Sequence, residues 1–183
     1  MKVKFYPYDV EAPVPIRTHA SKDRKLRLNP KHYEGIDPRE HFKPVGLWYG
    51  FGISWVEWQV DNMTENFKKN PFLHSITLSA DCNLYKIKSL VDLSDMIRRY
   101  QLHKVPITDS GFVWKKLRDD GYDGIEVRNF HSMKWTIYEM PAEFELSCFL
   151  WFHGLDCDSG CIWNVDKIVS SKLVAQMRAV QDD

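Results

Sequence analysis

The stretch VGLWYGFGISWVEWQV, residues 45–60, decides how the chain is expected to fold. Its first half is an apolar and aromatic run bounded by glycines, which predicts a buried strand over Val45–Phe51. A helix is expected next, because the apolar residues from Ile53 to Phe67 recur at helical spacing and give the helix one apolar face. Ser54 is a candidate N-cap of this helix, with Glu57 following at capping-box spacing.

Two tryptophans of this helix lie outside its apolar face. Trp55 and Trp58 are three residues apart, so they share a second face of the helix. A helix that only fills a core does not need two tryptophans there. The pair suggests a stacking site, with packing beneath a loop as the plainer alternative for Trp55.

On either side of this stretch, short apolar runs predict further strands, and capped periodic segments predict further helices. Strands are expected at 14–18, 74–78, 83–87, 124–127, 149–152 and 161–165, and helices at 89–100, from 109 or 110 to 121, and at 170–180. Residues 129–147 are ambiguous, and residues 22–45 are polar and proline-bearing, as expected of a long loop. Strands at both ends with helices between them favour an α+β fold over a doubly wound sheet.

The bulk composition limits the possible functions. A length of 183 residues suits one domain, taken here as 1–183. Lys+Arg and Asp+Glu both number 25, so no overall attraction to nucleic acid or membrane is implied. Four scattered cysteines and a start without a secretory pattern lead us to expect a cytoplasmic protein with reduced thiols. The longest apolar run is too short to span a membrane.

Several common site motifs are missing from the sequence. It has no glycine-rich phosphate loop and no Gly-x-Ser-x-Gly elbow, which argues against dinucleotide dehydrogenases, P-loop enzymes and serine hydrolases of that type. His153, Cys157 and Cys161 recur every four residues, but Gly154 and Gly160 argue against a helix that would bring them together. We therefore expect core cysteines and no metal site.

Three motifs follow one another in an order that is informative. The first is His19-Ala20-Ser21, the second is Gly46–Gly50 followed by Trp55, and the third places Asp156 and Asp158 before a late strand that closes with Asp166-Lys167-Ile168. In this order they resemble the ADP-ribosyltransferase superfamily, on the branch in which a histidine heads the first strand motif. The resemblance extends to residues 84–87 and 121–127, and small phage and bacterial members of the superfamily have similar segments in this order.

The resemblance implies a fold and an activity. The fold would be an ADP-ribosyltransferase-like α+β domain, with central split mixed or antiparallel sheets, flanking helices and an NAD cleft. The activity would be NAD-dependent mono-ADP-ribosylation of a macromolecule, protein or nucleic acid, with NAD as substrate. Such a protein would be a bacterial or phage effector, acting in the host cytoplasm if phage-encoded. Two alternatives stay open, an NAD-hydrolysing toxin and a non-catalytic partner-binding protein that keeps the fold.

The resemblance also assigns residues to roles. Catalytic roles fall on His19, Trp55 and an aspartate that is Asp156 or Asp158. The NAD-binding candidates are Thr18, His19, Ser21, Arg24, Trp48, Tyr49 and Ser54. The sequence departs from the family in two ways: the usual tyrosine of the second motif is represented by Tyr49 or Trp55, and the usual glutamate by an aspartate, with Ser159 near that place.

These residue types suit the chemistry. Breaking the nicotinamide–ribose bond builds positive charge on the ribose, as in glycoside hydrolysis, and a nearby carboxylate can stabilise that charge or act as a base. His19 is expected to donate to a ribose hydroxyl, and an aromatic ring to stack on nicotinamide. Glu126, between Ile125 and Val127, is expected to face solvent or the cleft edge. An alternative branch headed by Arg17, with Ser54 as its serine, also stays open.

Overall fold

The computed structural model describes residues 2–7, 16–30, 42–63, 68–104, 111–139, 152 and 154–180. The strands are β1 (Lys2–Pro7), β2 (Arg17–Ser21), β3 (Leu47–Phe51), β4 (Phe72–Leu78), β5 (Leu84–Ile87), β6 (Gly124–Val127), β7 (Ser159–Ile162) and β8 (Ile168–Val180). The helices are α1 (Ser54–Asn62), α3 (Leu90–Tyr100), α4 (Phe112–Asp119) and α5 (Phe130–Glu139), with 3-10 turns at η3 (Leu102–Lys104) and η6 (Val165–Lys167). The expected α+β class is confirmed.

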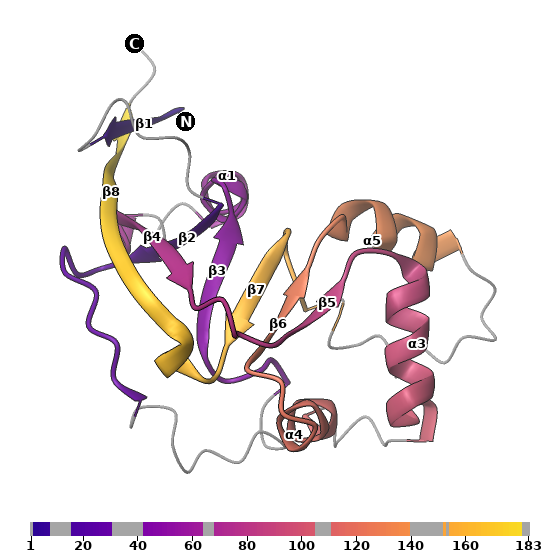
Figure 1. The fold of residues 1–183 in the computed structure, drawn as a ribbon. Coiled ribbons are helices and arrows are strands. Elements are labelled where there is room, and N and C mark those ends of the chain that lie inside the picture. The colour runs from indigo at the N-terminus through magenta and orange to yellow at the C-terminus, as the bar shows by residue number, and fades with distance from the viewer. Residues whose placement is uncertain are drawn as a thin grey trace.

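The strands form one mixed sheet in the order β1-β8-β4-β2-β3-β7-β6-β5 (Figure 1). All neighbours are antiparallel except β5 and β6, which are parallel. The expected split into two sheets is wrong, because β3 pairs with β7 from Leu47 to Gly50 and joins the two halves. Gly160 leaves room for the side chain of Tyr49, its partner on β3, since a Cβ there would lie 2.5 Å from the hydroxyl oxygen of Tyr49.

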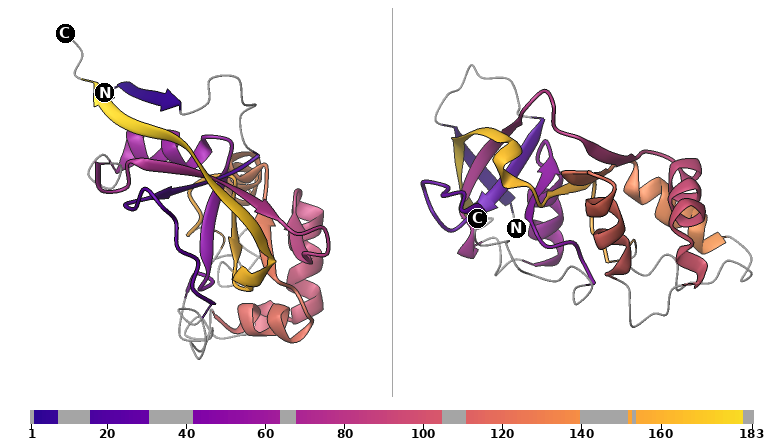
Figure 2. Two further views of the ribbon diagram at one scale, coloured as in Figure 1. Left: turned by 60° about the vertical axis from the view of Figure 1, so that its left-hand side comes forward. Right: turned by 60° about the horizontal axis from the view of Figure 1, so that its bottom comes forward.

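The helices gather on one side of the sheet (Figure 2). α1 packs through Val56 against Leu73 of β4 and Met177 of β8. α3, α4 and α5 enclose a larger core over β5 and β6, which includes Leu93, Trp114 and other fully buried side chains. The cross-strand register puts the residues beneath both groups on the same face, so a helical layer covers each half of the sheet.

Local signals explain where most of these elements begin and end. The Ser89 hydroxyl accepts a hydrogen bond from the Asp92 amide at 3.3 Å, which caps α3 as expected. After α4, Gly121 has a φ of 81°, a conformation that glycine adopts without strain. The strands expected at 74–78, 83–87 and 124–127 correspond to β4, β5 and β6. The ambiguous stretch 129–147 contains α5.

The helix expected at 170–180 is wrong, because these residues belong to β8. β8 pairs with both β4 and β1, and its alternate residues Ala175 and Met177 are buried against α1. A period of two decides the structure here, although the composition favours a helix. The strand expected at 14–18 begins later, at Arg17, and the one expected at 161–165 is β7, which ends at Ile162.

Some expectations fall largely outside the described residues. Of the strand expected at 149–152, only Phe152 is described, and it is assigned to a helix. Asp109 and Ser110, the candidate caps of α4, also lie outside the described residues. Residues 31–41 of the expected loop lie outside as well, and the described parts of that loop contain no strand before β3. None of the helices in the described ranges is long and apolar enough to span a membrane.

Candidate functional site

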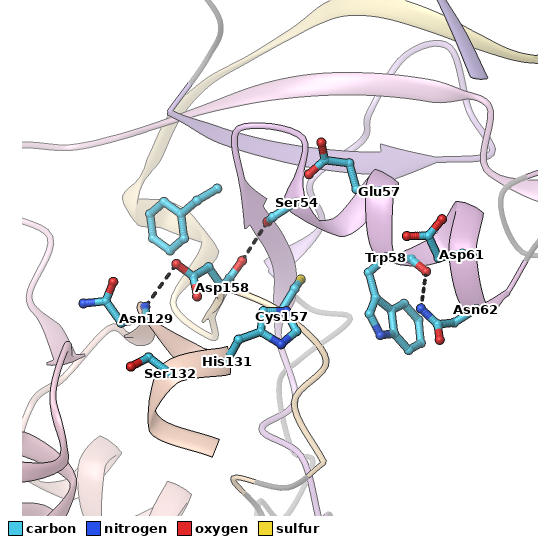
Figure 3. A pocket seen from close by; sticks show the side chains of 11 residues that line it. Ser54, Glu57, Trp58, Asp61, Asn62, Asn129, His131, Ser132, Cys157 and Asp158 are labelled. Atoms are coloured by element: carbon cyan, nitrogen blue, oxygen red, sulfur yellow. Dashed lines mark hydrogen bonds between the residues drawn. The ribbon is translucent and has the colours of Figure 1, made fainter. Parts of the chain in front are cut away.

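Two neighbouring pockets lie around the start of α1. The first, called the strand-gap pocket, has a volume of 270 Å³ and is lined by His19, Ala20, Lys43, Trp48, Tyr49, Trp55, Leu155, Asp156 and Ser159. The second, called the α1–α5 pocket, has a volume of 530 Å³ and is lined by Phe51, Ser54, Glu57, Trp58, Asp61, Asn62, Asn129, His131, Ser132, Cys157 and Asp158 (Figure 3). Together they fall in the size range of small-molecule sites.

The strand-gap pocket opens where β2 and β3 part. These strands pair only at Arg17–Phe51 and Thr18–Gly50, and the rest of β2 pairs with β4 alone. In the gap, His19 Nδ1 lies 2.7 Å from the Trp48 carbonyl oxygen. A side chain therefore satisfies a backbone group that the sheet leaves unpaired, and residues of both strands line the pocket.

The hydrogen bond of His19 fixes how its ring is protonated. A carbonyl oxygen only accepts, so Nδ1 carries the proton. Burial lowers the pKa of His19 below its usual 6.5. The hydrogen bond to the Trp48 carbonyl raises this pKa, but by less than burial lowers it, and nearby His74 lowers it further. The ring is then neutral near pH 7, and Nε2 is an acceptor. His19 is thus suited to accept a hydrogen bond from a ligand hydroxyl, whereas the sequence suggested that it donates one.

Aromatic rings make up much of the remaining wall. The Trp48 indole donates to the Pro44 carbonyl at 3.2 Å, which holds its ring in place. Tyr49 is buried, and its hydroxyl donates to Glu126 Oε1 at 2.8 Å. Burial and the neighbouring carboxylate raise the pKa of Tyr49 far above its usual value, so its phenol stays protonated. Tyr49 therefore has no free hydroxyl for a ligand, and its buried ring packs in the core with Leu47 and Ile76.

The two tryptophans of α1 are stacked, which confirms that they share one face of the helix. Their ring centroids are 5.0 Å apart, and the planes meet at 12°. Gly50 lets α1 approach this closely, since a Cβ there would lie 2.8 Å from Trp55 Cβ. Trp55 lines the strand-gap pocket and Trp58 lines the α1–α5 pocket. The stack is therefore a partition between the two pockets.

Asp158, one of the two candidate acids, caps a helix. Its Oδ1 accepts from the Phe130 amide at 2.8 Å, at the start of α5, and its Oδ2 accepts from the Asn129 amide at 3.1 Å (Figure 3). A carboxylate in this position satisfies free amides and complements the helix dipole. Both carboxylate oxygens are engaged, so Asp158 is poorly suited to chemistry.

Asp156, the other candidate acid, faces the strand-gap pocket. Its side chain keeps 27% of its exposure, and Oδ2 lies 3.5 Å from Lys43 Nζ, a loose ion pair. The same ammonium group lies 5.9 Å from the centroid of the Trp48 ring. Asp156 is therefore a reachable carboxylate in the pocket that also contains His19.

The other residues expected to bind NAD lie elsewhere. Thr18 is buried, and its hydroxyl donates to the Gly52 carbonyl. The Ser21 hydroxyl accepts from the Asp23 amide at 3.0 Å within a turn, and Arg24 is exposed. These three residues line neither pocket.

Ser54 does not cap α1, so the expected capping box with Glu57 is wrong. The N-cap position is Ile53, and no side chain caps it. The Ser54 hydroxyl donates instead to the Asp158 carbonyl at 3.0 Å, which ties α1 to the segment that precedes β7. This tertiary contact competes with local capping, and it puts Ser54 in the α1–α5 pocket.

A buried ion pair that the sequence did not lead us to expect lies beside the site. Glu126 is only 2% exposed, so the expectation that it faces solvent or the cleft edge is wrong. It binds Arg17 Nη2 at 2.6 Å in addition to the Tyr49 hydroxyl. All four residues of β6 are buried, so a charged residue among them requires partners. In the sequence, the signal was a glutamate inside this short apolar run. Arg17, which heads the alternative branch, is engaged in this ion pair and lines neither pocket.

The cysteines fit a structural role. Cys161 is fully buried and donates to the Pro44 carbonyl at 3.5 Å. Burial raises the pKa of the Cys157 thiol to about 12, so little thiolate exists near pH 7. His153, the third member of the spaced set, lies outside the described residues.

No protein-family model matches the sequence, and no match is found among curated proteins or solved structures. We therefore infer a function from the geometry of the two pockets.

Proposed function

We propose that the protein is an NAD-dependent mono-ADP-ribosyltransferase whose strand-gap pocket holds the nicotinamide and its ribose. One observation carries the proposal: His19, Trp55 and Asp156, from three separate segments, line a single pocket. The sequence motifs that resemble the family contain these same residues. Their meeting requires the fold, so it supports the resemblance independently of the sequence order.

Each group has a task in this proposal. Trp55 offers an aromatic face for the nicotinamide ring. A ribose hydroxyl donates to Nε2 of His19, and this contact orients the sugar. Asp156 lies where its negative charge can stabilise the positive charge that develops on the ribose.

The bond changes follow from these positions. The bond between ribose C1′ and the nicotinamide nitrogen breaks, and its electron pair stays with nicotinamide, which leaves as a neutral molecule. A nucleophile of the acceptor forms the new bond to C1′ and gives its proton to Asp156, from which the proton passes to water. If water is the nucleophile, the same site hydrolyses NAD, so the competing hydrolase uses the same residues.

The proposal is tested by incubating the protein with NAD labelled in the adenylate, alone and with a cell lysate. Nicotinamide release and label attached to macromolecules are measured for the wild type, Asp156→Asn and Asp166→Asn. Asp166 is an exposed aspartate of η6 outside both pockets and serves as the matched control.

The outcomes distinguish a transferase, a hydrolase and a partner-binding protein. Attached label that is lost in Asp156→Asn and kept in Asp166→Asn is the result expected of a transferase. Release of nicotinamide without attached label, sensitive to Asp156→Asn, identifies a hydrolase. If NAD neither binds nor reacts, the enzyme proposal is wrong and the partner-binding alternative takes its place.

A further inference from the structure

We propose that Lys43 exchanges its partner when the substrate binds: its ammonium group leaves Asp156 and pairs with the phosphate that NAD carries on the nicotinamide ribose. The exchange holds the substrate and at the same time gives the ribose the full negative charge of Asp156. This inference rests on the proposed function, because it concerns the ligand of the same pocket. It adds a substrate-binding residue that the sequence motifs do not contain, and it couples binding to the charge of the candidate acid.

The strand-gap pocket has a buried end and an exposed end. Leu155 and Ser159 line it and are 4% and 6% exposed, whereas the side chains of Lys43 and Asp156 keep 44% and 27% of their exposure. The volume of 270 Å³ lies below the range of about 300–1,000 Å³ that is usual for small-molecule sites. The pocket therefore holds one end of a dinucleotide, and the rest of the molecule leaves it past Lys43 and Asp156.

The order of groups in NAD brings a phosphate to the exposed end. The nicotinamide is joined to C1′ of the ribose, and the first phosphate is joined to C5′ of the same sugar. With the nicotinamide against Trp55 and the ribose beside His19, this phosphate comes next on the way out of the pocket. Lys43 is the only lysine or arginine among the described residues that line the pocket, and an ammonium group binds phosphate as a compact point charge.

The ion pair that engages Lys43 in the empty pocket is weak. Lys43 Nζ lies 3.5 Å from Asp156 Oδ2, whereas charge-assisted hydrogen bonds of this type are usually about 2.7–2.9 Å long. The pairs Lys115–Asp119 and Lys167–Asp81 are both 2.6 Å long, so lysines of this protein make closer contacts elsewhere. A long and partly exposed ion pair contributes little to stability, and the two phosphates of NAD carry more negative charge than one carboxylate. A phosphate can therefore replace Asp156 as the partner of Lys43.

The backbone on both sides of Lys43 is held in place, although its side chain is loosely bound. The Phe42 carbonyl accepts a hydrogen bond from the Trp114 indole at 3.1 Å, and the Val45 carbonyl accepts one from Arg118 Nη2 at 2.9 Å. Both donors belong to α4, and they fix a segment that has no helix or strand of its own. The ammonium group can therefore change partners by rotation of the side chain, while the chain stays at the pocket.

Trp48 keeps the ammonium group close to the pocket during the exchange. The centroid of its ring lies 5.9 Å from Lys43 Nζ, within the distance of about 6 Å at which an aromatic face attracts a cation. The indole is itself held by its hydrogen bond to the Pro44 carbonyl at 3.2 Å. Lys43 thus has a second contact that does not depend on Asp156.

The exchange changes the charge that Asp156 presents to the ribose. A positive charge 3.5 Å from its carboxylate opposes the stabilisation of a second positive charge on the sugar. Once the ammonium group pairs with the phosphate, this opposition is reduced and the carboxylate acts on the ribose alone. Nicotinamide riboside, which lacks the phosphate, fits the same pocket but leaves the pair of Lys43 and Asp156 intact.

Binding measurements on the intact protein test the inference. Nicotinamide riboside and nicotinamide mononucleotide differ only in the phosphate on C5′, so the ratio of their dissociation constants isolates the phosphate contact. Both are titrated by rapid-mixing tryptophan fluorescence, before turnover. The variants are Lys43→Met, Lys43→Arg, Asp156→Asn and the double variant Lys43→Met/Asp156→Asn. Lys115→Met is the matched control, because the Lys115 side chain is 45% exposed, is paired with an aspartate and lines neither pocket.

We expect the wild type to bind the mononucleotide at least about tenfold more tightly than the riboside, as for one charged contact. Lys43→Met should lose this preference, whereas Lys43→Arg and Lys115→Met should keep it. Asp156→Asn should increase the preference by roughly two- to fivefold, because the ammonium group no longer has to leave a carboxylate. When Lys43 is already methionine, the substitution of Asp156 should leave the ratio unchanged.

Other outcomes distinguish this inference from the proposed function. Equal affinity for the two ligands, or a preference that Lys43→Met retains, overturns the inference, and release of nicotinamide from NAD then leaves the enzyme proposal standing. A preference that depends on Lys43 but is not increased by Asp156→Asn overturns the exchange of partners. A preference with both dependences in a protein that releases no nicotinamide supports the exchange and overturns the transferase proposal. Binding of neither ligand overturns both.

Discussion

Arg17 and Glu126 are separated by 109 residues in the chain, yet Arg17 Nη2 lies 2.6 Å from Glu126 Oε1. The glutamate side chain is 3% exposed and the arginine 20%. The pair ties β2 to β6 across the sheet, and the Tyr49 hydroxyl completes it from β3. It therefore ties β2 and β3, which line the strand-gap pocket, to β6.

Removal of the Glu126 carboxylate should lower the free energy of unfolding. Glu126→Ala leaves the Arg17 guanidinium with a buried, uncompensated charge, and we expect a loss of about 3 kcal/mol in the free energy of unfolding. Urea denaturation measures this loss. The double variant Arg17→Met/Glu126→Leu is the control, since replacing both charges should restore part of the stability. A loss below about 1 kcal/mol in the single variant would show that solvent reaches the pair.

The two aspartates before β7 should differ in how much their removal lowers the stability of the protein. Asp158→Ala removes the cap of α5, and a loss of about 1–2 kcal/mol is expected. Asp156→Asn should change stability by no more than about 0.5 kcal/mol, because its ion pair with Lys43 is loose and partly exposed. Thermal unfolding of both variants makes the comparison. A stability loss confined to Asp156→Asn would reverse these assignments.

Stability should fall in mild acid. Burial lowers the pKa values of His19 and His74 below 6.5 in the folded protein. The unfolded chain then binds protons first as the pH drops, so the free energy of unfolding is at its full value above pH 6.5 and decreases below it. Urea titrations from pH 8 to pH 5 measure the slope. His19→Asn should reduce the slope, and an unchanged slope would mean that His19 is readily protonated in the fold.

The affinity for NAD should depend on the tryptophan stack. Trp55→Leu removes the ring that lines the strand-gap pocket, and a roughly two- to twelvefold weaker Kd is expected from a stacking contribution of about 0.5–1.5 kcal/mol. Titration calorimetry measures the change. Trp135→Leu is the control, because Trp135 is 68% exposed on α5 and lines neither pocket. Equal effects of both substitutions would argue against stacking at Trp55.

Much of the fold could be predicted from the sequence because its signals are local. The glycine-bounded run of β3, the Ser89 cap of α3 and the apolar strand β6 each follow from a few adjacent residues. β8 could not be predicted in this way, since its residues adopt a strand only because β4 and β1 are present on either side. Pairing between distant segments outweighed local propensity.

The candidate site could likewise be predicted from the sequence only in part. The motifs identified His19, Trp55 and Asp156 as candidates, and all three line one pocket. The sequence could not separate Asp156 from Asp158, because the difference lies in the amides of Asn129 and Phe130, which approach only in the fold. The acceptor property of His19 Nε2 likewise depends on the Trp48 carbonyl, which becomes available where β2 and β3 part.

The most direct test of the account is the release of nicotinamide from NAD by the purified wild type, Asp156→Asn and Asp166→Asn. We expect release by the wild type and by Asp166→Asn, and a fall of at least about a hundredfold in Asp156→Asn, as for the loss of a group that stabilises developing charge. Release at the wild-type rate by Asp156→Asn, or no release by any of the three proteins, would contradict the central claim that the strand-gap pocket cleaves NAD.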